Sequence, residues 1–127
     1  MALPRLAYFV PAEFQHPELV DSDAAYYLDD VRHRFAFPIH VRDDARVVGD
    51  RPPGSSPSSL HFSGRAFDLR WIQPAERLYH FVDCAMRTAA ERKVNIELEL
   101  VNSLQDRHIH IGLQKPGVES ELVVAAD

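Results

Sequence analysis

Apolar residues recur at steps of three and four in two segments of the chain, and this period predicts two amphipathic helices. The first helix is predicted to start after Asp21-Ser22-Asp23, because short polar side chains cap helix N-termini. Its buried stripe consists of Ala24, Leu28, Val31 and Phe35. The polar positions between them, Asp29 included, are expected on the solvent side.

The second helix is predicted from Pro74 onward, since proline suits the first turn of a helix. Its buried stripe consists of Leu78, Phe81, Val82, Ala85, Met86 and Ala89. The single cysteine, Cys84, falls within this stripe and is interpreted as a small buried hydrophobe. One cysteine cannot form an intramolecular disulfide, so nothing in the sequence indicates an oxidising compartment.

Alternation of apolar and polar residues with a period of two predicts strands in the rest of the chain. One strand is expected around Ile39 and Val41, and another over residues 66–71. Two more, over 94–101 and 107–113, are separated by a short turn and predict a β-hairpin. With the two helices, this pattern predicts an α+β fold in which both helices pack on an antiparallel sheet.

The polar face of the predicted hairpin gathers four ionisable side chains, which are Glu97, Glu99, His108 and His110. On the strand over 66–71, Asp68 points away from the core, which receives Phe67 and Leu69. A carboxylate is thus expected on a rigid strand beside a polar loop, a usual setting for a functional site.

Length and composition indicate one globular domain that spans residues 1–127. The chain is 46% hydrophobic and 26% charged, with a net charge of −5 and no cluster of Lys and Arg. Nucleic acids and anionic membranes attract such clusters, so we expect neither as a partner. No run approaches the roughly 20 apolar residues of a membrane span. We expect a monomer.

The N-terminal segment does not have the pattern of a secretion signal. Its apolar patch, Leu6 to Val10, is short and is interrupted by Pro11. We therefore expect synthesis in the cytoplasm without a signal peptide. The tail from Gly117 to Asp127 carries no site features.

The ten residues from Ser59 to Asp68 contain the strongest candidate chemistry of the chain. His61 and Asp68 lie seven positions apart, and imidazole nitrogen and carboxylate oxygen are both good zinc ligands. Gly64, between them, lets the chain fold back so that both side chains reach one point. On spacing alone, a surface pair between a loop histidine and a strand carboxylate explains the same residues.

The pattern Ser-x-His-x-x-Gly-x-Ala-x-Asp resembles the signature of the zinc DD-peptidase superfamily. It is formed here by Ser59, His61, Gly64, Ala66 and Asp68. That superfamily includes D-alanyl-D-alanine carboxypeptidases, vancomycin-resistance dipeptidases and phage endolysin peptidases, and its fold is shared with Hedgehog signalling domains. The resemblance covers roughly residues 7–113, and it implies a Hedgehog/DD-peptidase-like fold with zinc as the cofactor.

A catalytic zinc needs three protein ligands and an open position. In the relatives, a His-x-His near the C-terminal end of the domain provides the third ligand through its second histidine. That histidine is His110 here, so the resemblance implies the metal ligands His61, Asp68 and His110. His108 is then expected beside the metal, in a catalytic role. Taken alone, the two histidines would be surface residues of a strand.

The resemblance also implies two substrate-binding residues. Relatives place an arginine after a strand of Pro-Leu-x-Val type, where it faces the substrate carboxylate, and Arg46 takes that position here. The adjacent Asp43 and Asp44 allow a second interpretation, in which Arg46 is a loop residue held in a salt bridge. Ser59 is expected in the substrate cleft.

One position departs from the pattern of the relatives. Many of them carry a glutamate three residues before the last histidine ligand as the general base, and that position is Arg107 here. The other candidates for the base are His108, then Asp106, then Glu97 or Glu99. A base must reach the attacking water within about 3 Å, directly or through one more water.

The resemblance implies a zinc-dependent peptidase that hydrolyses peptidoglycan stem or cross-bridge peptides containing D-amino acids. Without a signal peptide, such an enzyme fits a phage or prophage lysis protein that is released to the cell wall during lysis. Arg107 at the usual base position favours an alternative from another class. In that alternative, the chain is a structural or binding module, such as a phage particle component, that keeps the fold, with or without the zinc, and has no turnover.

Overall fold

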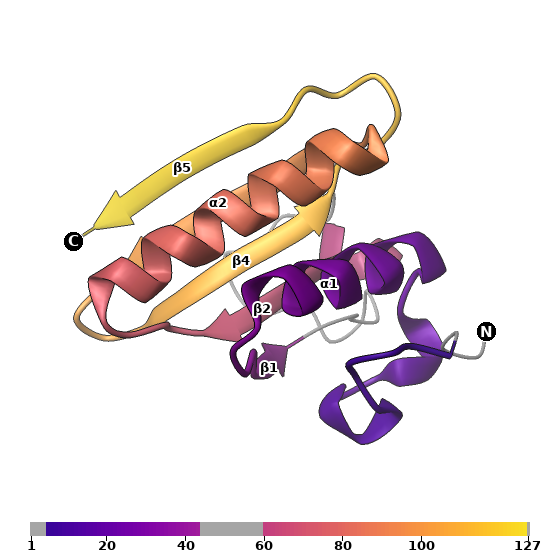
Figure 1. The fold of residues 1–127 in the computed structure, drawn as a ribbon, viewed down its shortest axis with the longest axis horizontal. Coiled ribbons are helices and arrows are strands. Elements are labelled where there is room, and N and C mark those ends of the chain that lie inside the picture. Colours follow the sequence, from indigo (N-terminus) through magenta and orange to yellow (C-terminus); the bar gives the residue numbers. More distant parts are fainter. Residues whose placement is uncertain (1–4, 44–59, 127) are drawn as a thin grey trace.

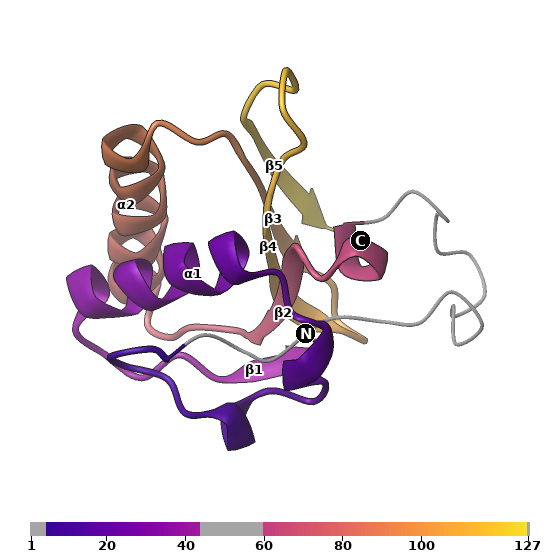
Figure 2. The same ribbon diagram turned by 90° about the vertical axis from the view of Figure 1, so that its right-hand side faces the viewer.

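The computed structural model describes residues 5–43 and 60–126, which form a five-stranded sheet with two helices on one face (Figures 1 and 2). The strands lie in the order β1-β2-β4-β3-β5. Their bounds are β1 Val41–Asp43, β2 Ala66–Arg70, β3 Ile96–Asn102, β4 Arg107–Leu113 and β5 Glu121–Ala126. The predicted α+β class is confirmed.

The sheet is mixed, so the prediction of a wholly antiparallel sheet is wrong. The pairs β1·β2, β2·β4 and β3·β4 are antiparallel, but β5 runs parallel to β3. β5 was not predicted because its sequence, Glu-Leu-Val-Val-Ala-Ala, lacks the polar and apolar alternation of the other strands. An edge strand that is exposed on both faces imposes no such alternation.

The helix α1 (Ser22–Phe35) begins where the sequence predicts, since the Asp21 carboxylate accepts a hydrogen bond from the Ala24 N–H at 3.0 Å. It ends at Ala36, whose left-handed backbone stops the helix. All four residues of its predicted stripe are buried. The buried Tyr27 adds a link to the second helix by donating its hydroxyl to the Ala85 carbonyl at 2.8 Å.

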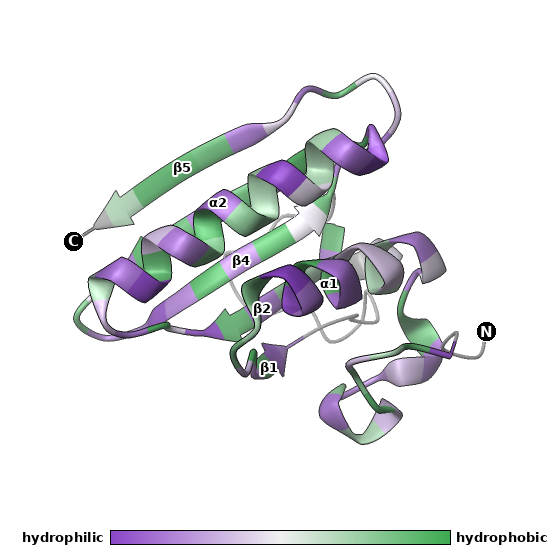
Figure 3. Cartoon of the chain, viewed as in Figure 1, coloured by the Kyte–Doolittle hydropathy of each residue, from purple (hydrophilic) through white to green (hydrophobic). Residues whose placement is uncertain are grey.

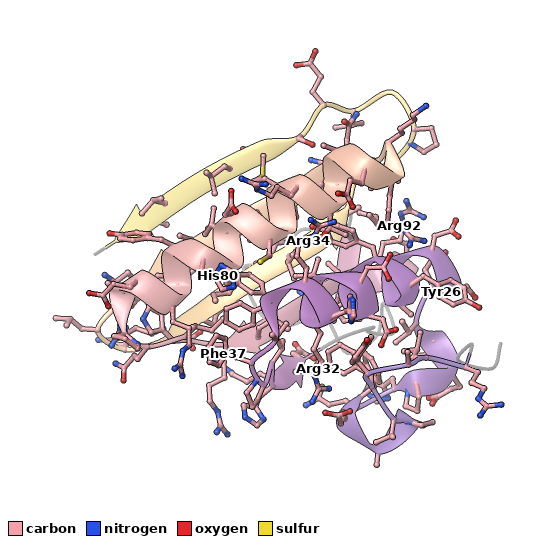
Figure 4. All side chains as sticks on the ribbon, in the orientation of Figure 1. Tyr26, Arg32, Arg34, Phe37, His80 and Arg92 are labelled. Atoms are coloured by element: carbon pink, nitrogen blue, oxygen red, sulfur yellow. The ribbon has the colours of Figure 1, made fainter. Side chains whose placement is uncertain are left out.

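The helix α2 (Ala75–Arg92) packs beside α1 on the same face of the sheet. Cys84 is buried, as predicted, but Met86 is 38% exposed and does not belong to the buried stripe. Its position on the outer flank of the helix faces solvent rather than the sheet. Figure 4 shows Arg34 and Arg92 where the helices meet, and they pair with Glu91 and Asp30 across the gap.

The core lies between the helices and the sheet. The alternating apolar residues of the strands are buried, namely Phe67, Leu69, Ile96, Leu98, Leu100, Ile109, Ile111 and Leu113. Val94, at the start of the predicted third strand, lies before β3 and is only half-buried. The other face of the sheet therefore carries the polar positions of β2, β3 and β4. Neither helix of the described part is long and apolar enough to cross a lipid bilayer.

The N-terminal arm, with short turns η1 (Pro11–Glu13) and η2 (Pro17–Leu19), is held against α1 by a buried carboxylate. Asp29 accepts hydrogen bonds from three consecutive backbone N–H groups, those of Ala7, Tyr8 and Phe9, at 2.8–3.1 Å. The prediction that Asp29 faces solvent is wrong, because the arm covers that side of the helix. Arg32, labelled in Figure 4, also holds the arm through Glu13 at 2.8 Å.

Candidate metal centre

The predicted metal ligands lie on the face of the sheet that the helices leave uncovered. His61 belongs to a short 3-10 helix, η4 (Leu60–Ser63), which Figure 2 shows on the side of the sheet opposite α1 and α2. Asp68 is at the centre of β2, and His110 is at the centre of β4. Two of the three ligands therefore stand on rigid, paired strands.

Gly64 fixes the position of η4. Its φ of +70° is left-handed, and a Cβ at this position would lie 2.0 Å from the Leu19 carbonyl oxygen. The Gly64 carbonyl accepts a hydrogen bond from the Asp21 N–H at 2.8 Å, immediately before α1. Only glycine combines this backbone with this approach, so the glycine of the motif attaches the His61 turn to the rest of the domain.

The pairing of β2 with β4 brings Asp68 and the two histidines of β4 together. In the antiparallel register, Asp68 is directly opposite His110, and Arg70 is directly opposite His108. Residues opposite each other on antiparallel strands share a face of the sheet. Asp68, His108 and His110 therefore project from the same side.

The three predicted ligands converge on one point. The Asp68 Oδ1 atom lies 3.3 Å from His61 Nε2 and 3.2 Å from His110 Nδ1. One donor atom from each of the three side chains can be chosen so that all lie within 4.8 Å of one another. His61 is buried, and the other two are half-buried. Two imidazoles and one carboxylate at this spacing fit zinc, and they leave a position open for another ligand.

The second ring nitrogen of His110 is hydrogen-bonded to a carboxylate. Its Nε2 contacts Glu97 Oε1, from the neighbouring strand β3. This contact orients the ring with Nδ1 toward Asp68. Histidines that bind metals commonly have such a carboxylate on the other nitrogen, where it fixes the tautomer and raises the basicity of the ligand.

The ionisation of the cluster is strongly coupled in the metal-free protein. Burial alone would raise the pKa of Asp68, but hydrogen bonds with His110 and His61 hold it well below its usual range. Burial likewise would lower the pKa of His110, but hydrogen bonds with Asp68 and Glu97 raise it to about 9. The bond to His110 lowers the pKa of Glu97. A metal would have to displace the His110 proton at neutral pH.

His108 lies beside the three ligands. Its Nε2 is 4.0 Å from Asp68 Oδ1. Its Nδ1 is buried and is 3.4 Å from Asp106 Oδ2, but it makes no hydrogen bond within the described part of the chain. Asp106 is itself held at 3.0 Å by Arg42 from β1. His108 thus presents one nitrogen to the cluster and the other to a carboxylate that is fixed in place.

The other predicted site residues have different outcomes. Arg46 and Ser59 lie outside the described residues. Arg107 stacks on the Trp71 ring, with its guanidinium carbon 4.6 Å from the ring centroid. Glu97, one candidate for the base, is hydrogen-bonded to His110 instead. Glu99 is half-buried directly opposite His110 in the β3·β4 register.

Sequence reasoning missed two contacts of the site. Glu97 was expected on the polar face of the hairpin but not as the partner of His110, since the register alone sets Glu99 opposite that histidine. Arg42 was not assigned to the site at all, because its partner Asp106 is 64 residues away in the sequence. The only sequence signal for Arg42 is its position one residue after Val41, on a predicted strand.

Comparisons with models of protein families, with curated proteins and with solved structures find no match to this chain.

Proposed function

We propose that this chain is a zinc-dependent peptidase that hydrolyses peptidoglycan peptides containing D-amino acids. The observation that carries the proposal is the convergence of His61, Asp68 and His110 on the open face of the sheet. Their order in the chain and the intervening glycine also resemble the zinc DD-peptidases. We further propose a Hedgehog/DD-peptidase type of fold and a role as a phage-type lytic enzyme that reaches the wall during lysis.

The three ligands would hold the metal with distinct supporting contacts. His61 comes from η4 and is buried, which limits the number of its orientations. His110 would bind through Nδ1, since Nε2 is hydrogen-bonded to Glu97. Bound zinc polarises a carbonyl and activates water near neutral pH.

We assign the proton transfer to His108. Its Nε2 faces the cluster, where it could receive a proton, and its Nδ1 faces the Asp106 carboxylate. The ring would take a proton from the attacking water and pass it to the leaving amine. Arg107 cannot fill this role, because a guanidinium does not accept protons. Arg46 and Ser59 remain proposed substrate contacts.

A second candidate function is a structural or binding module that has no turnover, with or without its zinc. It is favoured by Arg107, which occupies the base position of many relatives and stacks on Trp71. Only the peptidase requires metal, and the module could also hold it, so bound metal alone does not separate them. Hydrolysis does.

The first experiment measures zinc in purified wild-type protein by elemental analysis, beside His61→Ala, His110→Ala and the control His16→Ala, a histidine of the N-terminal arm that contacts Glu18. We expect about one zinc per chain in the wild type and the control, and none in the two ligand variants. Absence of zinc from the wild type, even after zinc is added back, would reject the peptidase and leave the module without zinc.

The second experiment separates them by mass spectrometry of peptidoglycan digests. The wild type is expected to release peptides, whereas His108→Ala should keep its zinc and lose about 10²–10⁴-fold in rate. If the zinc-loaded wild type releases no peptides from any type of peptidoglycan, the structural module is favoured. A fully active His108→Ala would show that another residue is the base.

A further inference from the structure

The two edges of the sheet differ in how they are protected. β1 has only three residues, its register with β2 is irregular, and it includes Arg42 and Asp43. Short length, irregular pairing and charge all discourage further strand pairing. β5, at the other edge, has six residues in regular register with β3 and has no second neighbour in the described sheet.

β5 is also apolar and exposed. Leu122 is 49% exposed and Val124 is 70% exposed, and Val123 between them is exposed as well. Glu121 is the only charged residue within the strand. Figure 3 shows the hydrophobic residues as a continuous band along β5 (green), at the rim of the molecule. Soluble proteins rarely leave such an edge unpaired, because its backbone groups form a template for another strand.

The apolar surface continues from β5 onto α2. A groove of about 660 Å³ opens between them, and Val124 lies in its wall together with Leu100, Leu78, Trp71 and Tyr79. Tyr79 is 68% exposed at this groove. Contiguous apolar surface of this kind marks an interaction site more often than single exposed residues do. It lies on the helix side of the sheet, whereas the metal centre lies on the other side.

In place of the monomer expected from the sequence, we propose that β5 pairs in antiparallel fashion with β5 of a second copy of this chain, across a twofold axis perpendicular to the sheet. With such an axis, the helix side of one copy's sheet continues into the helix side of the other copy's sheet. Each β5 residue must therefore pair with a residue that points to the same side of the sheet. Leu122 and Val124 belong to the helix face, like their β3 neighbours Leu98 and Leu100. Val123 belongs to the face of the metal centre.

The register centred on Val123 satisfies this condition with apolar pairs. Val123 then faces its own copy, and Leu122 of each chain faces Val124 of the other. Glu121 faces Ala125, so the charged residue of the strand meets no like charge. This self-complementarity favours a second copy over an unrelated strand. The partner's Leu122 also lies next to Val124 and extends the apolar wall of the groove.

The first test measures the mass of the intact protein in solution by sedimentation over a wide range of concentration. We expect twice the 14.4 kDa of one chain for the wild type. Val123→Lys should be monomeric, because two lysines would face each other on the axis. The control Leu104→Lys, at a 95% exposed position in the β3–β4 turn, should remain dimeric. Circular dichroism checks that each variant is folded.

The second test determines the register of the β5–β5 pair by oxidising cysteine variants. Val123→Cys should form an intermolecular disulfide with its own copy, since Cβ atoms of directly opposed residues lie within about 5.5 Å. Leu122→Cys alone should not, but it should cross-link when mixed with Val124→Cys. The native Cys84 is buried and does not compete. A monomeric wild type, a dimer that survives Val123→Lys, or cross-linking of Leu122→Cys to itself overturns the proposal.

Discussion

The imidazole of His110 lies between two carboxylates, and each of its ring nitrogens contacts one of them. The two carboxylates differ in what they would do once a metal is bound. Asp68 would share the metal with His110, whereas Glu97 would remain on the outer nitrogen. The orientation of one residue thus depends on a neighbour that is not itself a ligand.

Replacing Glu97 with glutamine should weaken zinc binding about 10- to 100-fold, because the ring loses the charged acceptor that raises its basicity. Competition with a chromophoric chelator measures the affinity. The matched control is Glu99→Gln, which removes the same charge from the same strand, directly opposite His110. If both variants weaken binding equally, the effect is one of net charge and Glu97 has no orienting role.

Two glycines with left-handed backbones test the attachment of the His61 turn. Gly64→Ala should lower the free energy of unfolding by about 3 kcal/mol or more, because the new methyl group would overlap the Leu19 carbonyl. Gly117→Ala should cost only about 1–2 kcal/mol, since its φ is also left-handed but nothing lies within 4 Å. Urea denaturation measures both. Equal losses would mean that the backbone conformation alone matters at Gly64.

At the scale of single residues, the sequence predicted the three converging side chains but not all of the residues that contact them. His61 and Asp68 were identified by a ten-residue motif, and His110 by the His-x-His that the resemblance implies as the third ligand. The contact of Glu97 with His110 joins two strands, and that of Arg42 with Asp106 joins β1 to the turn before β4. They depend on side-chain reach across the sheet, which no local pattern encodes.

Among the elements, the N-terminal arm depends on one buried carboxylate of α1. Asp29 accepts three backbone N–H groups of the arm. Asp29→Ala should lower the free energy of unfolding by about 1–3 kcal/mol, because those donors lose their partner. It should also speed hydrogen exchange at residues 7–9.

The adjacent residue provides the control for that variant. Asp30 pairs with Arg92 at the surface, so Asp30→Ala should change stability by less than about 1 kcal/mol. It should leave exchange in the arm unchanged. Loss of arm protection in both variants would indicate that α1 as a whole, and not the Asp29 carboxylate, holds the arm.

The helices were predictable because each buries one stripe, and their stripes repeat every three or four residues. Asp29 is an exception, because the arm covers a second side of α1.

β5 was not predicted for a different reason. Its residues are exposed on both faces, so no alternation distinguishes a strand from a loop. The mixed topology of the sheet follows from this one strand.

For the molecule as a whole, the coupled cluster sets how stability depends on pH. The pKa of His110 is raised from 6.5 to about 9, so its stabilising contribution is complete below pH 6.5 and is lost as the pH rises through 9. The lowered pKa values of Asp68 and Glu97 act in the opposite direction. Their contributions are present above their ordinary values of 3.8 and 4.5 and are lost on acidification.

The metal-free protein should therefore be most stable between about pH 4.5 and pH 6.5, and it should lose up to about 3 kcal/mol by pH 9. Denaturation in the presence of a chelator measures this profile. His110→Ala should flatten the alkaline decline. Saturation with zinc should reverse the decline, since the metal competes with the proton. An unchanged alkaline decline in His110→Ala would assign it to another group.

Both helices cover the same face of the sheet, and this has a consequence for a pair of copies joined at β5. The two faces that carry the candidate metal centres would look in one direction, so both centres would lie on the same side of the pair. A soluble peptide would meet them one at a time. A polymer laid out as a surface, as a cell wall is, would engage both together, and release from one centre would leave the molecule tethered by the other. If the proposed hydrolysis takes place at these centres, the pair would move along its substrate rather than leave it after each cut.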